Sequence, residues 1–369
     1  MKICIISKNA FLAVSKKNSQ FAGGAEFQLI GLARALVSYG HLVSIITDDF
    51  GQYEKEITNG LIYYKVPFRY MGGANFWLIP DWFRLAKKIL SIDADFYILK
   101  GPRFLLALLG YMNSRFRKNV VFISTIDTDS QPEILNKIDP FYHRMLYKFG
   151  LKNISYVVSQ SITQQQNFKL NFNKNSWIIK NIYKTKNSNS DNNKQNYVLW
   201  VGTNNQLKRP ELMLVFAKLL PEIKFKMAMI PSTDADIQQK FESDVTQVTN
   251  IDFLGFVPES KIGELYGEAS LLVNFSKLEG FPNVFLHAWA NKTPVITLEV
   301  DPDNVIKKYG LGYCAETMEN MVKHVKSLLQ NPEKLKEIGD NCYNYVKKEH
   351  APEVIIRKYE ELFETISQR

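Results

Sequence analysis

The chain has 369 residues, more than one hydrophobic core usually holds, so we expect two domains. Apolar residues make up 46% and charged residues 22%, which excludes a disordered or fibrous chain. Lysine and arginine number 46 against 37 acidic residues, a net charge of +9. No zinc-finger or RNA-recognition motif accompanies this charge, so we expect no nucleic-acid partner.

The sequence also bears on location, disulfides and metals. No apolar stretch approaches the ~20 residues that cross a bilayer, and the amino-terminal run is too short for a signal-peptide core. We therefore expect a cytoplasmic protein. Cys4, Cys314 and Cys342 are far apart and the five histidines form no ligand motif, so we expect neither a disulfide nor a metal site.

The first half alternates short apolar runs with helical segments. Lys2 to Ser7 and Leu42 to Thr47 are predicted strands, and the segment between them is a predicted helix that ends at Gly40. Further strands are predicted at Leu61 to Val66, Phe96 to Leu99, Val120 to Ile123 and Tyr156 to Ser159. This pattern is typical of a parallel sheet with helices on both faces.

A polar stretch, residues 184–195, marks the expected linker. A second alternating series follows, with one helix at Pro210 to Leu220 and strands at Tyr197 to Val201, Lys224 to Met229, Ile251 to Leu254, Leu271 to Asn274 and Pro294 to Thr297. We thus expect two α/β domains with Rossmann-like, doubly wound parallel sheets, residues 1–183 and 196–350. The helix in residues 351–369 is expected to pack back on the first domain.

Ligands of parallel sheets bind beyond the carboxyl ends of the strands, so the loops after strands are the places to search. Gly23 and Gly24 precede the first helix, where backbone amides and the helix dipole favour a phosphate; a purely conformational glycine is the alternative. Lys208 and Arg209 stand at a second helix start, marked by Pro210. They are expected either to meet an anionic ligand or to be solvated.

The third loop, Glu279 to Ala290, carries the strongest signal. An acidic residue and a glycine separate a strand from a helix that begins near Asn283. Backbone amides at this helix start suit a diphosphate, while the Glu279 carboxylate suits sugar hydroxyls. His287, one turn into the helix, can point toward the same place.

These motifs together resemble glycosyltransferase family 4, whose members are retaining enzymes of the GT-B fold. The resemblance covers essentially the whole chain, and the segments that carry it are Gly23 to Glu26, Gly40 to Val43, Gly202 to Lys208, Phe253 to Val257, Glu279 to Ala290 and Pro294 to Ile296. It implies two Rossmann-like domains that face each other across a cleft. The first would bind the acceptor, and the second a nucleoside-diphosphate sugar, UDP- or GDP-linked, with no further cofactor.

The resemblance also implies roles for individual residues. Lys208 would neutralise the diphosphate and Glu279 would hydrogen-bond the transferred sugar. Donor contacts are further implied for Gly23, Gly24, Gly202, Thr203, Arg209, Gly280, Phe281, Pro282, Asn283, Val284 and His287.

Three positions depart from the family pattern. Thr203 stands where Arg is frequent, and Arg209 would compensate for the missing cation. His287 replaces a second glutamate that takes the ribose hydroxyls, and an imidazole cannot accept from two hydroxyls as a carboxylate does. Where a histidine is frequent the chain has Asp127 and Asp129; either Asp127 or Asp129 contacts the sugar, or they cap a turn.

The activity implied is transfer of a sugar to a saccharide or lipid-linked acceptor, with retention and without metal, in bacterial cell-surface polysaccharide or glycolipid assembly. Two alternatives stay open: a nucleotide-sugar epimerase or hydrolase of the same fold, and a catalytically silent binding subunit. Aromatic and basic residues alternate between Phe68 and Lys88. They predict either contact with an anionic membrane, on the inner face of the plasma membrane, or a buried helix with a basic edge.

Overall fold

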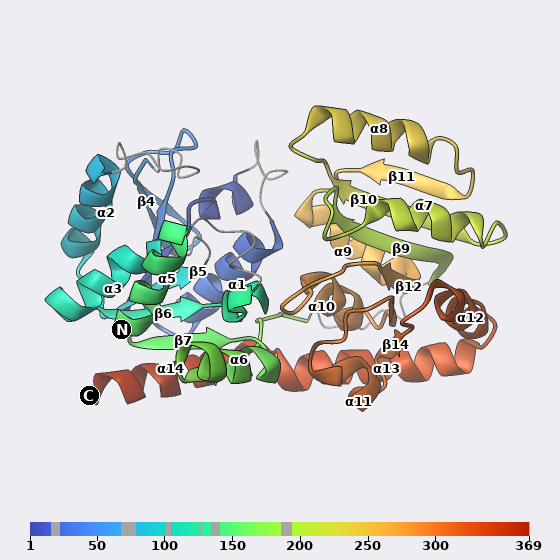
Figure 1. Ribbon diagram of the computed structural model, residues 1–369. Coiled ribbons are helices and arrows are strands. Elements are labelled where there is room, and N and C mark those ends of the chain that lie inside the picture. Colours follow the sequence, from blue (N-terminus) through green and yellow to red (C-terminus); the bar gives the residue numbers. More distant parts are fainter. Residues whose placement is uncertain are drawn as a thin grey trace. The chain divides into compact units, whose positions relative to one another are not determined.

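The computed structural model describes residues 1–15, 23–67, 79–100, 105–124, 127–133, 141–185 and 194–368 (Figure 1). The chain forms two compact units. Unit 1 comprises residues 1–182 and 352–369, and unit 2 comprises residues 183–351. No helix in the described ranges combines the length and the apolarity that crossing a bilayer requires.

Unit 1 is built on a sheet with the strand order β3-β4-β2-β1-β5-β6-β7-β8 in the described residues. All neighbours are parallel except β3 and β4, which form an antiparallel pair. The strands are β1 (Lys2–Ile6), β2 (Leu42–Thr47), β3 (Lys55–Thr58), β4 (Leu61–Lys65), β5 (Phe96–Lys100), β6 (Asn119–Ile123), β7 (Tyr156–Ser159) and β8 (Ser176–Ile178).

Helices cover both faces of this sheet. They are η1 (Ala10–Ala13), α1 (Gly24–Ser38), α2 (Ile79–Ile92), α3 (Leu105–Phe116), η4 (Asp127–Ser130), α5 (Phe141–Asn153), α6 (Ile162–Phe172) and α14 (Pro352–Ser367). Side chains alternate across β5: Phe96 and Ile98 pack with α1 and α14, and Tyr97 and Leu99 pack on the side of α2, α3 and α5. The carboxy-terminal helix α14 is thus part of unit 1, and its Phe363 stacks on Phe96 with ring centroids 4.3 Å apart.

Unit 2 has a parallel sheet with the strand order β11-β10-β9-β12-β13-β14. Figure 1 shows β11, β10, β9, β12 and β14 in this order from top to bottom. The strands are β9 (Gln195–Thr203), β10 (Lys224–Ile230), β11 (Ile251–Gly255), β12 (Ala269–Asn274), β13 (Val295–Thr297) and β14 (Gly312–Cys314). The helices are α7 (Pro210–Lys218), α8 (Ala235–Val245), α9 (Glu259–Glu268), α10 (Asn283–Ala290), η5 (Pro302–Asn304), α11 (Val305–Tyr309), α12 (Met318–Leu329) and α13 (Pro332–Glu349).

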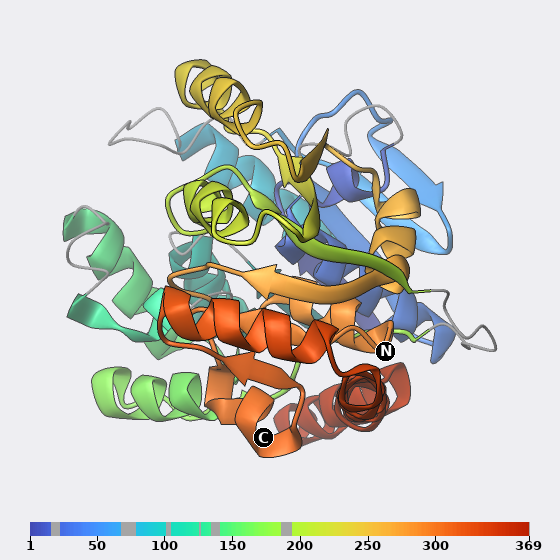
Figure 2. The same cartoon turned by 90° about the vertical axis from the view of Figure 1, so that its right-hand side faces the viewer.

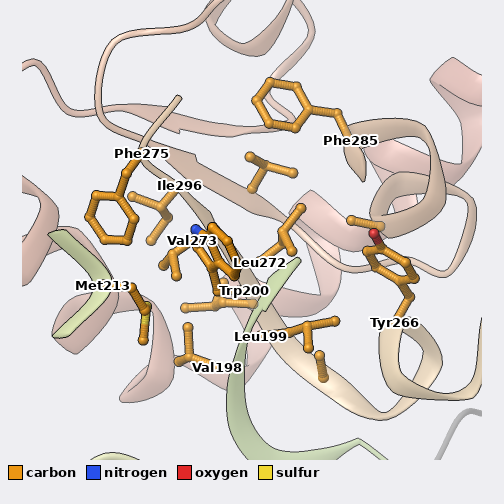
Figure 3. Packing of buried hydrophobic residues seen from close by; sticks show 14 of the residues in the cluster. Val198, Leu199, Trp200, Met213, Tyr266, Leu272, Val273, Phe275, Phe285 and Ile296 are labelled. Carbon is orange, nitrogen blue, oxygen red and sulfur yellow. The ribbon is translucent and has the colours of Figure 1, made fainter. Parts of the chain in front are cut away.

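The core of unit 2 lies between this sheet and helices on both of its sides. Figure 2 shows α7 and α8 on one side of the strands and α9 on the other. Trp200 of β9 is fully buried, and Figure 3 shows its indole beside Val273 of β12 and Ile296 of β13. Because both faces are covered, the central strands read as continuous apolar runs in the sequence.

The predicted strands and helices all occur, with ends shifted by at most two residues. The helix predicted to Leu220 ends at Lys218, for example, and β9 begins at Gln195. Gly40 has φ +86°, the left-handed conformation expected after α1. Short strands such as β8 and β14 were not predicted, because three residues carry too little periodicity.

Candidate active site

The loop after β9 places a lysine and an arginine at the start of α7. The Asn205 side-chain oxygen accepts hydrogen bonds from the backbone N–H groups of Leu207 and Lys208, at 3.1 and 3.0 Å, which fixes a tight turn. Arg209 follows with φ +49°, and Pro210 begins α7. Both cations therefore stand at the positive end of a helix dipole, where an anion is favoured.

Lys208 forms an ion pair with Glu279, which lies in the turn between β12 and α10. The two side chains are 24% and 13% exposed, so the pair is partly shielded from water. A backbone hydrogen bond of 2.8 Å from Lys277 N–H to Leu207 O ties the same two loops together. The two motifs that the sequence predicted separately, 71 residues apart, therefore form one site in unit 2.

Arg209 is held mainly by the protein itself. Its Nε donates to Phe275 O at 2.6 Å and its Nη1 to Glu299 Oε1 at 2.7 Å. Its Nη2 is buried and has no hydrogen-bond partner among the residues that the structure describes. Two of its three nitrogens thus fix the loop, which leaves only Nη2 for the compensating role that the sequence suggested beside Thr203.

The segment from Gly280 to Val284 forms the turn into α10. Gly280, Phe281 and Pro282 are buried, and Asn283 begins the helix. The Phe281 ring packs against Trp289 and His350, with centroids 6.2 and 5.1 Å apart, so this side chain anchors the turn. What the turn can offer a ligand is the positive end of the α10 dipole, beside Lys208.

His287 is enclosed by two tyrosines of the same unit. Its Nδ1 lies 3.1 Å from the Tyr183 hydroxyl, and its ring stacks on Tyr266 at 5.2 Å with 19° between the planes. Burial lowers the pKa of His287 to about 4, so the ring is neutral at physiological pH. Nε2 makes no hydrogen bond within the described ranges and is the atom left to meet a ligand. Sequence reasoning missed Tyr183, which lies in no motif.

Gly202 and Thr203 lie at the carboxyl end of β9, opposite Met229 and Ile230 of β10. A Cβ on Gly202 would lie 2.7 Å from the indole of Trp200. Packing alone therefore explains a glycine at this position, because the indole of Trp200 leaves no space for a side chain.

Gly23 and Gly24 lie at the start of α1 in unit 1. Gly23 has φ −92°, so the alternative interpretation, a glycine needed for positive φ, is wrong at this position. Its N–H donates to Glu26 Oε2 at 3.1 Å, closing a cap on the helix. In this structure the Gly23 amide thus points at Glu26.

Asp127 begins η4, the 3-10 turn that follows β6, and its side chain lies outside the described part of the structure. Asp129 is 2% exposed; its backbone oxygen accepts from the Tyr147 hydroxyl at 2.7 Å, and its Oδ2 lies 3.4 Å from Ser124 Oγ. Of the two aspartates, Asp129 therefore has the structural role of holding this turn.

Lys100, at the carboxyl end of β5, was missed by sequence reasoning. It is 8% exposed and lines a cavity of about 20 Å³ with Gln28, whose Oε1 is buried without a partner in the described residues. Burial lowers the pKa of Lys100 to about 8, and the nearby Glu26 opposes this shift. The signal was a single lysine ending the apolar run Phe96 to Leu99.

Comparison with known families gives one match. Residues 181–345 match the family Glycosyl transferases group 1. The matched segment covers most of unit 2, including the Lys208–Glu279 pair and α10.

Two curated relatives are glycosyltransferases by name. The GPI3 subunit of phosphatidylinositol N-acetylglucosaminyltransferase from Saccharomyces cerevisiae is 24% identical over 302 residues, 75% of this chain and 65% of that protein. The O-antigen chain mannosyltransferase RfbU from Salmonella typhimurium is 26% identical over 215 residues, 57% of this chain and 60% of that protein. The chain thus spans somewhat less than two thirds of the length of these relatives.

Solved structures establish the fold. Sucrose-phosphate synthase from Thermosynechococcus elongatus aligns with a TM-score of 0.75 at 16% identity, over 100% of this chain and 99% of that one. HepE from Anabaena, solved in complex with UDP-glucose, aligns with a TM-score of 0.73 at 15% identity, over 98% and 99%. The prediction of an α/β GT-B fold with two Rossmann-like domains is confirmed.

Proposed function

We propose that the protein is a retaining glycosyltransferase that moves a sugar from a nucleoside-diphosphate sugar to an acceptor hydroxyl. The observation that carries this proposal is the pairing of Lys208 with Glu279 at two loop-helix junctions, inside the segment that matches the family. A cation beside a carboxylate is what a donor of this kind requires, since one end is an anionic diphosphate and the other a sugar rich in hydroxyls.

In the proposed reaction, Lys208 moves from the Glu279 carboxylate to the diphosphate and stabilises the charge that develops on the leaving group. Glu279 then accepts hydrogen bonds from the sugar. The bond between the anomeric carbon and the diphosphate breaks while the acceptor oxygen attacks from the same face, and the acceptor proton passes to a diphosphate oxygen. In this proposal the Nη2 of Arg209 also meets the diphosphate, and the Nε2 of His287 meets the nucleotide.

The proposal needs no metal ion, because Lys208 and the start of α10 supply the positive charge. It takes a UDP- or GDP-linked donor, with Gly23 and Gly24 of unit 1 near the donor diphosphate and Asp127 in contact with the transferred sugar. A saccharide or lipid-linked acceptor and a cytoplasmic place in bacterial cell-surface polysaccharide or glycolipid assembly extend the same proposal. The two relatives named above, a phosphatidylinositol N-acetylglucosaminyltransferase subunit and an O-antigen chain mannosyltransferase, support this extension.

The test is a thermal-shift screen of nucleoside diphosphates and nucleotide sugars, followed by transfer assays with the donor that stabilises the protein most. Lys208→Ala should keep the fold and lower kcat by on the order of 10²-fold. Lys218→Ala, an exposed lysine at the far end of α7, is the matched control and should keep full activity.

The two alternative activities give different outcomes. Donor turnover without an acceptor would identify an epimerase or hydrolase, and nucleotide binding without any turnover would identify a silent subunit. Near-normal transfer by Lys208→Ala would remove the loop after β9 from the mechanism.

A further inference from the structure

The helix α5 turns apolar side chains toward solvent. Its exposed positions are Phe141, Tyr142, Met145, Lys148, Phe149 and Lys152, which lie on one stripe of the helix. Phe141 is 67%, Met145 57% and Phe149 46% exposed. A surface helix of a globular protein normally presents polar residues to solvent. A stripe of exposed apolar residues therefore indicates an interaction surface.

The packing of α5 keeps this stripe outside. Its opposite side, with Tyr147 and Leu151, is buried in the core of unit 1. Gly150 lies against α3 so closely that a Cβ there would come within 2.6 Å of the Leu106 backbone. The helix therefore cannot rotate its aromatic stripe inward without breaking this contact.

The neighbouring helix α3 adds to the same kind of surface. Tyr111 and Phe116 are 50% and 43% exposed, and the Arg115 guanidinium lies over the Phe116 ring at 5.6 Å. Figure 1 shows α3 and α5 side by side in unit 1, as their contacts require. We call the exposed side chains of these two helices the α3/α5 face.

The charge of the α3/α5 face has one sign. The sequence holds no Asp or Glu from Phe96 to Ile126, and none from Phe141 to Ser190. The cations of the two helices and the residue that follows α3 are Arg115, Arg117, Arg144, Lys148 and Lys152. Lys118, two residues after the end of α3, forms an ion pair with Asp93.

We propose that the α3/α5 face docks on an anionic lipid membrane. Aromatic rings together with lysine and arginine are the composition that settles at a bilayer interface, where rings enter the headgroup region and cations meet lipid phosphates. The two helices themselves carry cations and no Asp or Glu, a composition that is complementary to such a layer. This function goes beyond sugar transfer and does not depend on it.

The site differs from the membrane segment expected from the sequence, Phe68 to Lys88. Residues 68–78 lie outside the described residues, and α2 buries Leu85 and Ile89 in the core, as the alternative interpretation of that segment expected. Phe83 and Lys87 are exposed on α2, which packs beside α3.

Co-sedimentation of the full-length protein with vesicles tests the proposal. We expect binding to phosphatidylcholine vesicles that contain phosphatidylglycerol, weakening as salt rises, and little binding to phosphatidylcholine alone. The triple variant F141S/M145S/F149S and the charge variant K148E/K152E should each weaken the apparent Kd at least tenfold. The charge variant changes only exposed side chains, so it separates docking from misfolding.

Unit 2 offers matched controls. V215S/L219S/I237S removes three side chains that are 51%, 50% and 49% exposed, and K218E/K240E makes the same change of charge. Both controls should bind vesicles like the wild type. Absence of wild-type binding at low salt, or equal loss in variants and controls, would overturn the proposal. So would a dimer in light scattering that F141S/M145S/F149S converts to a monomer, because the face would then join two copies of the chain.

Discussion

Removing the negative charge of Glu279 should tighten the binding of nucleoside diphosphates. The Glu279 carboxylate is paired with Lys208, the cation that the proposed mechanism directs at the diphosphate. A ligand without a sugar gains nothing from Glu279 and has to displace it. Glu279→Gln should therefore release Lys208 and remove a repulsive charge, while keeping the size of the side chain.

The degree of burial sets the magnitude. Fully exposed ion pairs contribute about 0.2–1 kcal/mol, whereas breaking a buried one costs about 3–5 kcal/mol. With side chains 24% and 13% exposed, the pair of Lys208 and Glu279 falls between these limits, at about 1–2 kcal/mol. Since about 1.4 kcal/mol is tenfold in affinity, the Kd for UDP or GDP should fall about 5- to 30-fold in Glu279→Gln.

Titration calorimetry with UDP and GDP measures this change. Glu222→Gln is the control, because it removes the same charge from an exposed pair with Lys326 and should leave both Kd values unaltered. The transfer rate should move the other way, with kcat falling about 10- to 100-fold, because the sugar loses a charged hydrogen-bond acceptor. An unchanged or weaker Kd for both nucleotides in Glu279→Gln would refute the competition between carboxylate and diphosphate.

The other predictions concern the supports of the site and the sheet. Arg209→Ala loses the hydrogen bond to Phe275 O, so the free energy of unfolding, measured by urea denaturation, should fall by about 1–3 kcal/mol. The transfer rate should fall less than in Lys208→Ala. Unaltered stability would contradict this role of Arg209. The pKa of His287 is about 4 in the folded protein and near 6.5 in the unfolded chain. Between these pH values the unfolded chain binds more protons, so the free energy of unfolding falls as the pH drops from about 6.5 to 4. His287→Gln should flatten that slope in urea titrations at several pH values, and an identical slope would disprove the shift. Gly312→Ala, at φ +138°, puts a Cβ against a backbone oxygen of β13 and should lower the free energy of unfolding by more than about 3 kcal/mol. Gly255→Ala, at φ +60° with open space around it, should lower it by about 1 kcal/mol. Equal losses of stability in the two variants would contradict the steric reasoning.

Local sequence patterns determined the elements and the fold class of this chain. Apolar runs such as Phe96 to Leu99 bury both faces of a strand, and helical periodicity between them leaves a parallel sheet as the consistent arrangement. The places of the loops followed as well, because parallel strands present their carboxyl ends at one edge. Lys208 and Glu279 were predicted in this way, each from its own loop.

Tertiary structure decided which side chains meet, because contacts between distant segments depend on packing that no local pattern records. The joining of Lys208 to Glu279, the enclosure of His287 by Tyr183 and Tyr266, and the hold of Arg209 on Phe275 O belong to this class. The same holds for α5, whose sequence mixes aromatic and basic residues. Its close contact with α3 at Gly150 uses the other side of the helix and leaves the aromatic stripe facing solvent.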